Sequence, residues 1–448
     1  MPIILLVVLS LLIPFNGFSI VNIGDYGVEY ALLPALFLVT YTLVRMLLTR
    51  QAVPAFVFYP ALTVIGAAAL SLFAYYFINE FSISEYVKSF LHLIFYVVLF
   101  LCIASIRVKT ESIIKLLKIN LLFATFICLY GFYQVPARFY DWPFAYPAFN
   151  NVSGTLINTK FFDLFVRPSS IFLEPSFLGA YLIDAILVIG ICMIFDKTLI
   201  VRSKYVRSLM LATFIGMLFC SFSIGAFLVL AMVACVMFVC LHIPHKWRKL
   251  SIGTFTLLGL LAAANFAIQA GIGVNLLEFI GARFSNIFAQ LFLGESAMSG
   301  DSLPKRFRSI AMAFQLWTNY PLTGVGIGNY GIHASKEGLF IYTDSALMST
   351  MSEQGLVGIL AYVALFGVIL VNLFDSVRNP VRSKLDTLKC AFFFVVVAHA
   401  IELSFNMGSI LHLREWFPLG LAALLLRQGN GKIRHENSDH QPPTPISA

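Results

Sequence analysis

Charged side chains that could take part in chemistry gather in two long polar segments, residues 136–176 and 271–352. The first ends in RPSSIFLEPS, which runs from Arg167 to Ser176 directly before an apolar run. Pro175 suits the first turn of a helix and holds the residue before it extended, so the Glu174 carboxylate is expected at the mouth of that helix. There it can act as a base near a guanidinium that binds phosphate. It can equally complement the helix dipole or pair with Arg167.

The second polar segment contains a basic amphipathic sequence. Apolar side chains recur at helical spacing between residues 305 and 317, which predicts a helix lying at a membrane surface. Arg306 and Arg308 open this helix. Positions two apart point roughly 200° apart on a helix, so only one of these arginines faces a given anionic ligand. Either can instead reach out to lipid phosphates.

Two further carboxylates precede the next apolar run, at Asp344 and Glu353. Nine residues separate them, which places them on opposite faces of one helix, so at most one faces a given substrate. Asp344 is well placed as a helix N-cap. Either carboxylate is a candidate base for an acceptor hydroxyl. His333 is a weaker candidate base.

A few charged groups lie inside or at the ends of apolar runs, where they need partners. His399 and Glu402 are three residues apart and share a helix face, so we expect them to pair inside the bundle. Arg414 stands beside Glu415 near the start of the last apolar run. It either contributes to a phosphate site or neutralises its neighbour.

Common catalytic motifs are absent from the sequence. It has no HExxH, Walker or GxSxG motif and no carboxylate-rich cluster, so we expect no metal site and no cofactor. The stretch GIGNYG at residues 326–331 is a literal GxGxxG, but no strand or βαβ unit surrounds it, and its glycines are expected to permit a tight turn. The seven cysteines lie in apolar runs and form no CxxC pair.

Composition determines the fold class. Of 448 residues, 59% are hydrophobic and 12% are charged, whereas soluble domains carry roughly 25% charged residues. We therefore predict an all-α polytopic membrane protein whose single domain, residues 1–427, has about twelve transmembrane helices. The predicted spans are residues 3–21, 27–47, 53–78, 86–106, 113–135, 177–195, 207–222, 224–242, 250–270, 355–374, 387–405 and 411–426. The apolar stretch 207–242 is too long for one crossing and is divided at Ser221-Phe222-Ser223.

Charge placement predicts the orientation. Most of the 30 Lys and Arg residues fall on one side if both termini are cytoplasmic, as the positive-inside rule requires. The two long polar segments then become periplasmic loops, and loops of such length usually have a function. Residues 428–448 are polar and Pro-containing, which predicts a disordered cytoplasmic tail.

Four segments resemble the O-antigen polymerase (Wzy) family, within the O-antigen ligase and polymerase superfamily. They are Arg167 to Gly179, Ser221 to Leu228 (SFSIGAFL), Arg306 to Tyr330 and Asp344 to Gly358. The resemblance, which covers about residues 150–375, implies a metal-independent, GT-C-like glycosyltransferase of the bacterial inner membrane in lipopolysaccharide or exopolysaccharide biosynthesis. Such an enzyme moves a glycan from undecaprenyl pyrophosphate to the acceptor sugar of a lipid-linked repeat unit on the periplasmic face.

The resemblance also implies roles for single residues. Arg167 matches the first-loop arginine of polymerases, and Arg306 or Arg308 matches the basic residue that opens the second-loop motif, so these side chains are expected to hold pyrophosphate. Glu174 matches the polymerase-like Glu-Pro-Ser. The expected partners are an undecaprenyl-pyrophosphate-linked oligosaccharide and a chain-length regulator membrane protein, with no nucleic acid.

The chain departs from the ligase pattern in two places, and this favours the polymerase. Where ligases read Ser-Arg-Gly, it has Ser223-Ile224-Gly225, and where they have His-Asn it has Thr343-Asp344. An O-antigen ligase that transfers glycan to lipid A-core remains the alternative. A transporter of lipid-linked oligosaccharides, from another class, predicts repeats and charges at mid-bilayer. Polar sequence concentrated in two outer loops instead favours surface chemistry.

Overall fold

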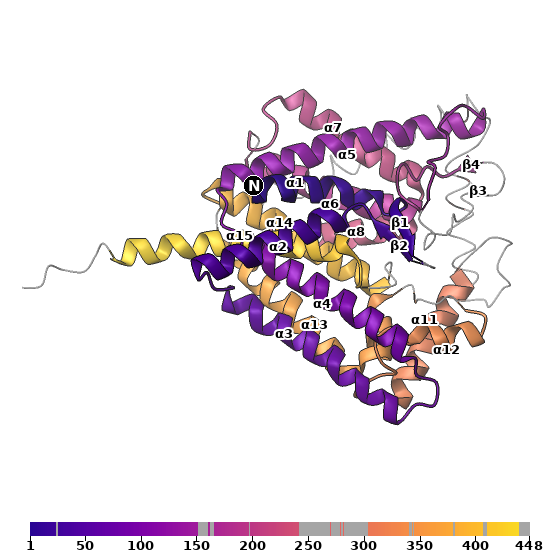
Figure 1. The fold of residues 1–448 in the computed structure, drawn as a ribbon. Coiled ribbons are helices and arrows are strands. Elements are labelled where there is room, and N and C mark those ends of the chain that lie inside the picture. Colours follow the sequence, from indigo (N-terminus) through magenta and orange to yellow (C-terminus); the bar gives the residue numbers. More distant parts are fainter. Residues whose placement is uncertain are drawn as a thin grey trace, which may run out of the picture.

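The computed structural model describes most of the chain. The described residues are 1–23, 26–150, 160–161, 165–196, 198–241, 303–339, 343, 345–379, 381–405 and 410–438, with the isolated positions 269, 278 and 281. Within them the chain forms a bundle of long helices with two short hairpins (Figure 1). The predicted all-α polytopic membrane fold is confirmed.

The bundle helices follow the predicted spans closely. They are α1 (Pro2–Leu12), α2 (Leu32–Thr49), α3 (Ala55–Leu70), α4 (Ile83–Ser105), α5 (Thr110–Phe139), α6 (Pro175–Phe195), α7 (Lys204–Ser221), α8 (Ile224–Cys240), α13 (Ala346–Arg378), α14 (Lys384–Phe405) and α15 (Leu413–Ser438). The 3-10 turns η1 (Ile13–Phe15) and η2 (Ser71–Tyr76) extend α1 and α3. Among the described residues, seven helical segments are long and apolar enough to cross a membrane. The predicted span 250–270 lies outside the described residues.

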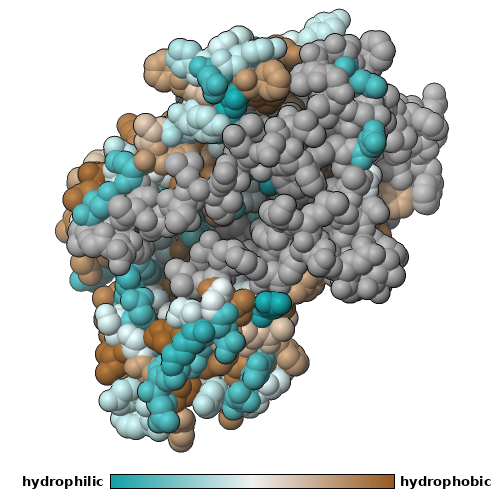
Figure 2. Space-filling model, turned by 90° about the vertical axis from the view of Figure 1, so that its right-hand side faces the viewer, coloured by the Kyte–Doolittle hydropathy of each residue, from teal (hydrophilic) through white to brown (hydrophobic). Residues whose placement is uncertain are grey.

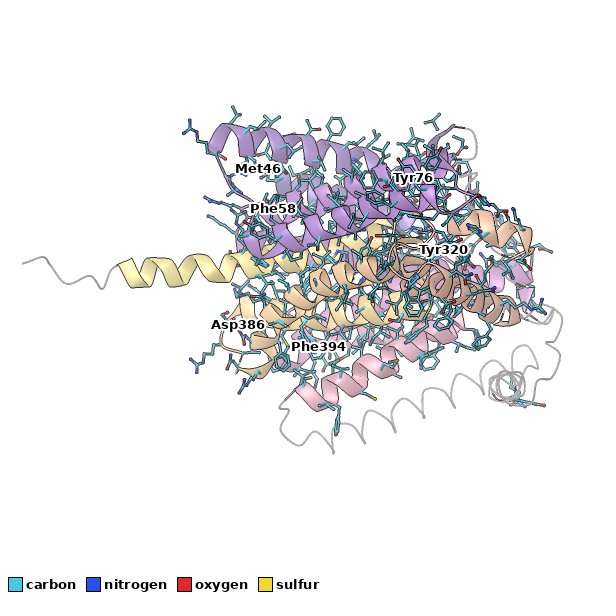
Figure 3. The ribbon with its side chains drawn as sticks, turned by 90° about the horizontal axis from the view of Figure 1, so that it is seen from below. Met46, Phe58, Tyr76, Tyr320, Asp386 and Phe394 are labelled. Atoms are coloured by element: carbon cyan, nitrogen blue, oxygen red, sulfur yellow. The ribbon has the colours of Figure 1, made fainter. Side chains whose placement is uncertain are left out.

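Successive helices run in opposite directions. In Figure 3, Met46, Phe58 and Asp386 lie at one end of the bundle, whereas Tyr76 and Tyr320 lie toward the other. α14 is central, because it packs on α6, α8, α13 and α15. Among the described residues, α6 and α14 are also the most deeply buried of the candidate spans, as expected for helices that are predominantly apolar.

One end of the bundle collects the irregular elements, and we call it the loop end. It carries the hairpin β1 (Ser19–Ile23) and β2 (Tyr26–Glu29), the pair β3 (Lys160–Phe161) and β4 (Phe165–Val166), and the helices α11 (Leu303–Asn319) and α12 (Tyr330–Lys336). These elements lie together on the right of Figure 1, opposite the projecting end of α15. Figure 2 faces the loop end and shows hydrophilic side chains among hydrophobic ones in its lower part.

Two predicted boundaries are wrong. The predicted span 3–21 ends early, because Pro14, Asn16 and Gly17 interrupt the helix and the β-branched residues after them pair in the β1–β2 hairpin. α15 continues to Ser438, twelve residues beyond the predicted end of the span 411–426. Gly429 and Gly431 do not interrupt it, and the first proline that would stop it is Pro442. Residues after Ser438 lie outside the description.

The division of the long apolar stretch is confirmed. α7 ends at Ser221, Phe222 adopts a left-handed conformation with φ 46°, and Ser223 caps α8. The Ser223 hydroxyl accepts the Ala226 N–H at 3.4 Å, which is the usual N-cap interaction. Gly179 of α6 packs directly on this break, since a Cβ there would lie 2.8 Å from the Cβ of Ala226.

The GxGxxG stretch belongs to a glycine segment, residues 320–331, that packs against the start of α13. The Val325 N–H donates to the Ser352 carbonyl at 2.7 Å, and the Leu356 N–H donates to the Pro321 carbonyl at 2.8 Å. α13 kinks at Gly355, whose φ is 64°. A Cβ on Gly355 would lie 2.3 Å from the backbone of Leu322. The glycines therefore serve close packing between backbone segments.

Gly355→Ala should destabilise the protein strongly. A left-handed alanine costs of order 1–3 kcal/mol, and the contact with Leu322 adds to this. Gly367→Ala, in the same helix with open space around it, should be neutral or stabilise by about 0.5–1 kcal/mol, since alanine favours helix. Thermal unfolding in detergent measures both variants. Equal midpoints would contradict the packing role of Gly355.

Candidate functional site

Arg167 lies at the break between α7 and α8. Its Nε donates a hydrogen bond to the carbonyl of Ser221 at 2.8 Å. Arg138, buried near the end of α5, holds the backbone of the same segment by donating to the Arg167 carbonyl at 2.6 Å and to the Ser169 hydroxyl at 3.2 Å. Two of the resembling segments, one starting at Arg167 and the other at Ser221, are thus in contact.

α5 also fixes the turn that leads into α6. Gln134 is fully buried and exchanges two hydrogen bonds with the backbone of Ser170, at 3.0 and 2.7 Å. The Ser170 hydroxyl donates to the Ile127 carbonyl at 2.7 Å. Ser170 has a left-handed backbone with φ 52°, a conformation held only where the surroundings enforce it. The approach to α6 is therefore a rigid turn.

Glu174 stands at the mouth of α6, as predicted. It is the N-cap residue with an extended backbone (φ −132°, ψ 149°), and Pro175 opens the helix. Its Oε2 accepts a hydrogen bond from the Ser176 hydroxyl at 2.9 Å, and the side chain is half-buried. A carboxylate here benefits from the positive end of the helix dipole and keeps access to the loop end.

The predicted amphipathic helix is α11. Its residues Ala313 and Leu316 are buried against the loop end, whereas Phe307 and Phe314 are exposed. Ser309 anchors α11, since its hydroxyl lies 2.7 Å from the hydroxyl of Tyr330 in α12. Arg308, beside Ser309, is exposed, and the side chain of Arg306 lies outside the described residues.

Glu353 lies in the first turns of α13, next to the glycine segment. Its Oε1 accepts the N–H of Tyr330 at 3.3 Å. Asp344 lies outside the described residues, and the N-cap of α13 is the next residue, Ser345, whose hydroxyl accepts the Met348 N–H at 3.2 Å. The N-cap prediction for Asp344 is thus wrong by one position. The resembling segments that start at Arg306 and Asp344 are therefore in contact through Tyr330 and Glu353. The segments that start at Arg167 and Ser221 are likewise in contact at the break between α7 and α8.

His333 lies in α12, with its Nδ1 3.6 Å from Oε2 of Glu80. Burial lowers the pKa of His333, and the nearby Lys336 lowers it further, while Glu80 raises it. A hydrogen bond from Lys336 lowers the pKa of the Glu80 carboxyl. His333 is therefore a neutral group at neutral pH that sits in a surface ion cluster.

A buried network of charged side chains joins α6, α14 and α15. The Nδ1 of His399 lies 2.6 Å from Oε2 of Glu415, and its Nε2 lies 3.1 Å from Oδ2 of Asp184. Arg414 donates to Oε2 of Glu402 at 2.7 Å. The predicted pairing of His399 with Glu402 is thus wrong. Two residues on one helix face need not pair with each other. Here the neighbouring helices supply the hydrogen-bond partners of both His399 and Glu402.

This network does not suit a metal ion. His399, Glu402 and Glu415 offer ligand atoms that lie within 4.8 Å of one another. Both ring nitrogens of His399 are already hydrogen-bonded to carboxylates, and the guanidinium of Arg414 is hydrogen-bonded to the Glu402 carboxylate. A metal ion would have to displace these contacts and lie beside a cation.

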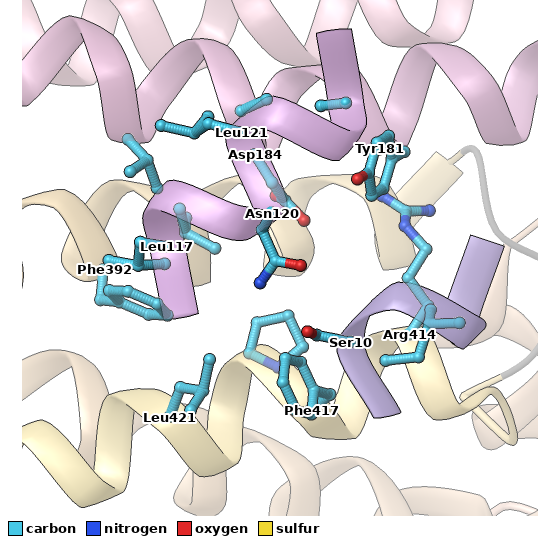
Figure 4. A pocket seen from close by; sticks show the side chains of 16 residues that line it. Ser10, Leu117, Asn120, Leu121, Tyr181, Asp184, Phe392, Arg414, Phe417 and Leu421 are labelled. Carbon is cyan, nitrogen blue, oxygen red and sulfur yellow. The ribbon is translucent and has the colours of Figure 1, made fainter. Parts of the chain in front are cut away.

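Arg414 donates a hydrogen bond to Glu402 within the network. No described contact links it to Arg167 or Arg308. It also borders a cavity of about 100 Å³, which is lined by residues of α1, α5, α6, α14 and α15. Figure 4 shows the side chains of Asn120, Asp184 and Arg414 around this space, with Leu117, Leu121 and Phe417 among its apolar lining.

Sequence reasoning missed Arg138 and Gln134 as the groups that hold the Arg167 segment. Both lie in the last turns of α5, four residues apart and hence on one helix face. Polar residues at that spacing near the end of an apolar run were a usable signal. In this segment they bind the Arg167 carbonyl, the Ser169 hydroxyl and the Ser170 backbone, which lie 29, 31 and 36 residues further on, at separations that the sequence does not reveal.

Residues 209–363 match the O-antigen ligase family. The match spans three of the four resembling segments, from the break between α7 and α8 through α11 and the glycine segment to the first half of α13. No curated protein matches the chain. Over residues 209–363 the chain is therefore similar to the O-antigen ligase family, whose members are membrane glycosyltransferase-like ligases and polymerases.

Proposed function

We propose that the protein is a polysaccharide polymerase. It transfers a growing glycan from undecaprenyl pyrophosphate to the acceptor sugar of a second lipid-linked repeat unit. The family match supports an enzyme that acts on lipid-linked oligosaccharides. The polymerase activity, the lipid carrier and the roles of single residues are our proposals.

One observation carries the proposal, namely the hydrogen bond of 2.8 Å between Nε of Arg167 and the Ser221 carbonyl. It ties a guanidinium from the first long loop to the break between α7 and α8. Glu174 follows seven residues later at the mouth of α6. A cation and a carboxylate are thereby held on rigid backbone at the loop end, where a lipid head group would arrive.

In the proposed reaction, a hydroxyl oxygen of the acceptor sugar attacks the anomeric carbon of the donor glycan. The bond between that carbon and the pyrophosphate oxygen breaks, and the lipid pyrophosphate leaves with the electron pair. Negative charge grows on the phosphate oxygens, so guanidinium groups stabilise the transition state more than the ground state. Arg167 and Arg308 supply these groups, with Arg306 as the alternative to Arg308.

The acceptor proton passes to a carboxylate. We favour Glu174, because its described hydrogen bond comes from the neighbouring Ser176 hydroxyl and its carboxylate is half-exposed at the loop end. Glu353 is the second candidate, although its Oε1 already accepts the Tyr330 N–H. Asp344 is the third.

The polymerase is favoured over the ligase by the sequence at two places, Ser223-Ile224-Gly225 and Thr343-Asp344. A deletion strain separates the two functions. Loss of a polymerase leaves single-repeat caps on the lipid acceptor, whereas loss of a ligase leaves none. Single-repeat caps that a plasmid copy converts to long chains would support the proposal, and uncapped acceptor would identify a ligase.

The buried network supports a second candidate, a transporter of lipid-linked oligosaccharides. Charges in the interior of a membrane bundle often mark transport pathways, and Asp184 borders a cavity with Asn120. Proteoliposomes loaded with a lipid-linked oligosaccharide decide between the two. A transporter moves the lipid between leaflets without changing glycan length, whereas a polymerase lengthens the glycan.

We further propose that the loop end faces the periplasm and that both termini lie in the cytoplasm of a bacterial inner membrane. Basic residues on the opposite connections support this orientation. A chain-length regulator membrane protein remains a proposed partner. Fusions of alkaline phosphatase to the α11 segment and to the carboxyl terminus test the orientation.

A further inference from the structure

The centre of the buried network is His399, which bridges two helices. Both of its ring nitrogens lie within hydrogen-bond distance of carboxylates, Glu415 from α15 and Asp184 from α6. Only the doubly protonated ring can donate to both. In that form His399 is a cation that links α6 and α15 to α14, and its side chain is almost fully buried, with 1% exposed.

Fold stability does not require such a network. It sets three carboxylates against two cationic groups inside an apolar bundle, and taking charges out of water is expensive. Replacing a buried ion-pair network by well-packed apolar side chains is often neutral or stabilising. In some proteins such buried charged groups instead specify one arrangement of the helices, which apolar packing alone would leave undefined.

The network holds the helix that carries Glu174. Asp184 lies ten residues after Glu174 on α6, which corresponds to about 15 Å along a helix. α6 is also the helix that packs through Gly179 on the break between α7 and α8, where Arg167 is bound. A shift or rotation of α6 at Asp184 is thus transmitted to both proposed site residues.

α14 connects the network to the other half of the site. The Ser404 carbonyl near the end of α14 accepts a hydrogen bond of 2.7 Å from the hydroxyl of Ser345, the N-cap of α13. The first turns of α13 hold the glycine segment and Glu353. α14 thereby contacts both the helix of Glu174 and the helix of Glu353.

We propose that His399, together with Asp184 and Glu415, is a positioning residue that holds α6 against α14 and α15 and so aligns Glu174 and Arg167 for glycosyl transfer. The inference rests on the proposed function. It assigns a role to helices α14 and α15, which lie outside the matched residues 209–363. None of the three side chains is proposed to touch the substrate.

Single variants test the proposal first. His399→Gln and Asp184→Asn should each lower the turnover number of the purified enzyme at least tenfold, while the KM for the lipid-linked substrate changes less than threefold. The double variant should be no slower than His399→Gln alone, because both changes break the same link. Thr387→Val removes a buried hydroxyl near the other end of α14 and should leave turnover unchanged. Additive losses in the double variant would overturn the shared link.

An apolar replacement separates positioning from stability. Asp184→Leu, His399→Phe and Glu415→Leu combined leave Arg414 and Glu402 as a balanced pair. This triple variant should unfold at the wild-type temperature or above, yet turn over at least tenfold more slowly. Wild-type turnover in the folded triple variant would overturn the positioning role. If the triple variant does not fold, the single variants decide.

Failure of the inference is distinguishable from failure of the proposed function. If the wild-type enzyme and the His399→Gln variant lengthen the glycan at the same rate, the positioning role of His399 is contradicted and the polymerase function is supported. If the wild-type enzyme does not lengthen the glycan, the proposed function falls and the positioning role falls with it.

Discussion

Arg167→Ala is expected to lower the rate of glycan elongation about 100-fold to 1,000-fold, the usual cost of removing one fixed donor from a developing anion. The guanidinium would stabilise the charge that grows on the leaving pyrophosphate. It is held in place from two sides, by its own bond to the Ser221 carbonyl and by the bond of Arg138 to its backbone carbonyl. Such preorganisation makes the group effective, since little rearrangement is needed during reaction.

The measurement is single-turnover elongation by purified enzyme, with long-chain polysaccharide in a complemented deletion strain as the cellular readout. Arg167→Lys should recover only part of the loss, because lysine cannot reproduce the paired geometry of a guanidinium. Arg202→Ala, an exposed arginine in the connection before α7, should have no effect and controls for loss of charge.

Arg308→Ala should act in the same direction as Arg167→Ala if the exposed side chain of α11 completes the phosphate site. If both variant proteins are present in the membrane at normal abundance and long-chain polysaccharide is unchanged, the proposed roles of these arginines are contradicted. Loss of the preferred chain length alone, with chains still formed, would indicate that α11 is a regulatory surface.

Glu174→Gln is expected to lower turnover about 100-fold to 10,000-fold, the usual contribution of a positioned general base. Glutamine preserves the shape at the mouth of α6 and can still accept the Ser176 hydroxyl, so folding should change little. The lost interaction with the helix dipole costs about 0.3–1 kcal/mol. KM should change far less than turnover, because the proton is taken in the transition state.

Glu111→Gln provides the matched control for Glu174→Gln. Glu111 is a carboxylate in the first turn of the membrane helix α5, as Glu174 is at the N-cap of α6, but it lies at the end of the bundle opposite the loop end. It should lose a similar small stability and keep full turnover. Wild-type turnover in Glu174→Gln would remove Glu174 from the mechanism and make Glu353 and Asp344 the remaining candidates.

Local features were predictable because neighbouring residues determine them. Apolar runs of the right length located the bundle helices, the Ser221-Phe222-Ser223 interruption located the break between α7 and α8, and Pro175 located the start of α6. The amphipathic pattern of residues 305–317 likewise predicted α11. In each case the physical cause lies within one or two helical turns.

Partners distant in the sequence were not predictable. His399 was expected to pair with Glu402, three residues away, but its partners come from Asp184 and Glu415 on other helices. The link from Arg138 to Arg167 depends on how α5 packs against the approach to α6. Periodicity indicates which face of a helix is polar, whereas the helix that meets this face is determined by the packing of the whole bundle.

The most direct test of the account uses the purified protein in lipid nanodiscs with an undecaprenyl-pyrophosphate-linked oligosaccharide. The account predicts products longer by whole repeat units, with release of undecaprenyl pyrophosphate, and loss of both in Arg167→Ala. A wild-type protein that binds no such lipid and extends no glycan would contradict the polymerase assignment.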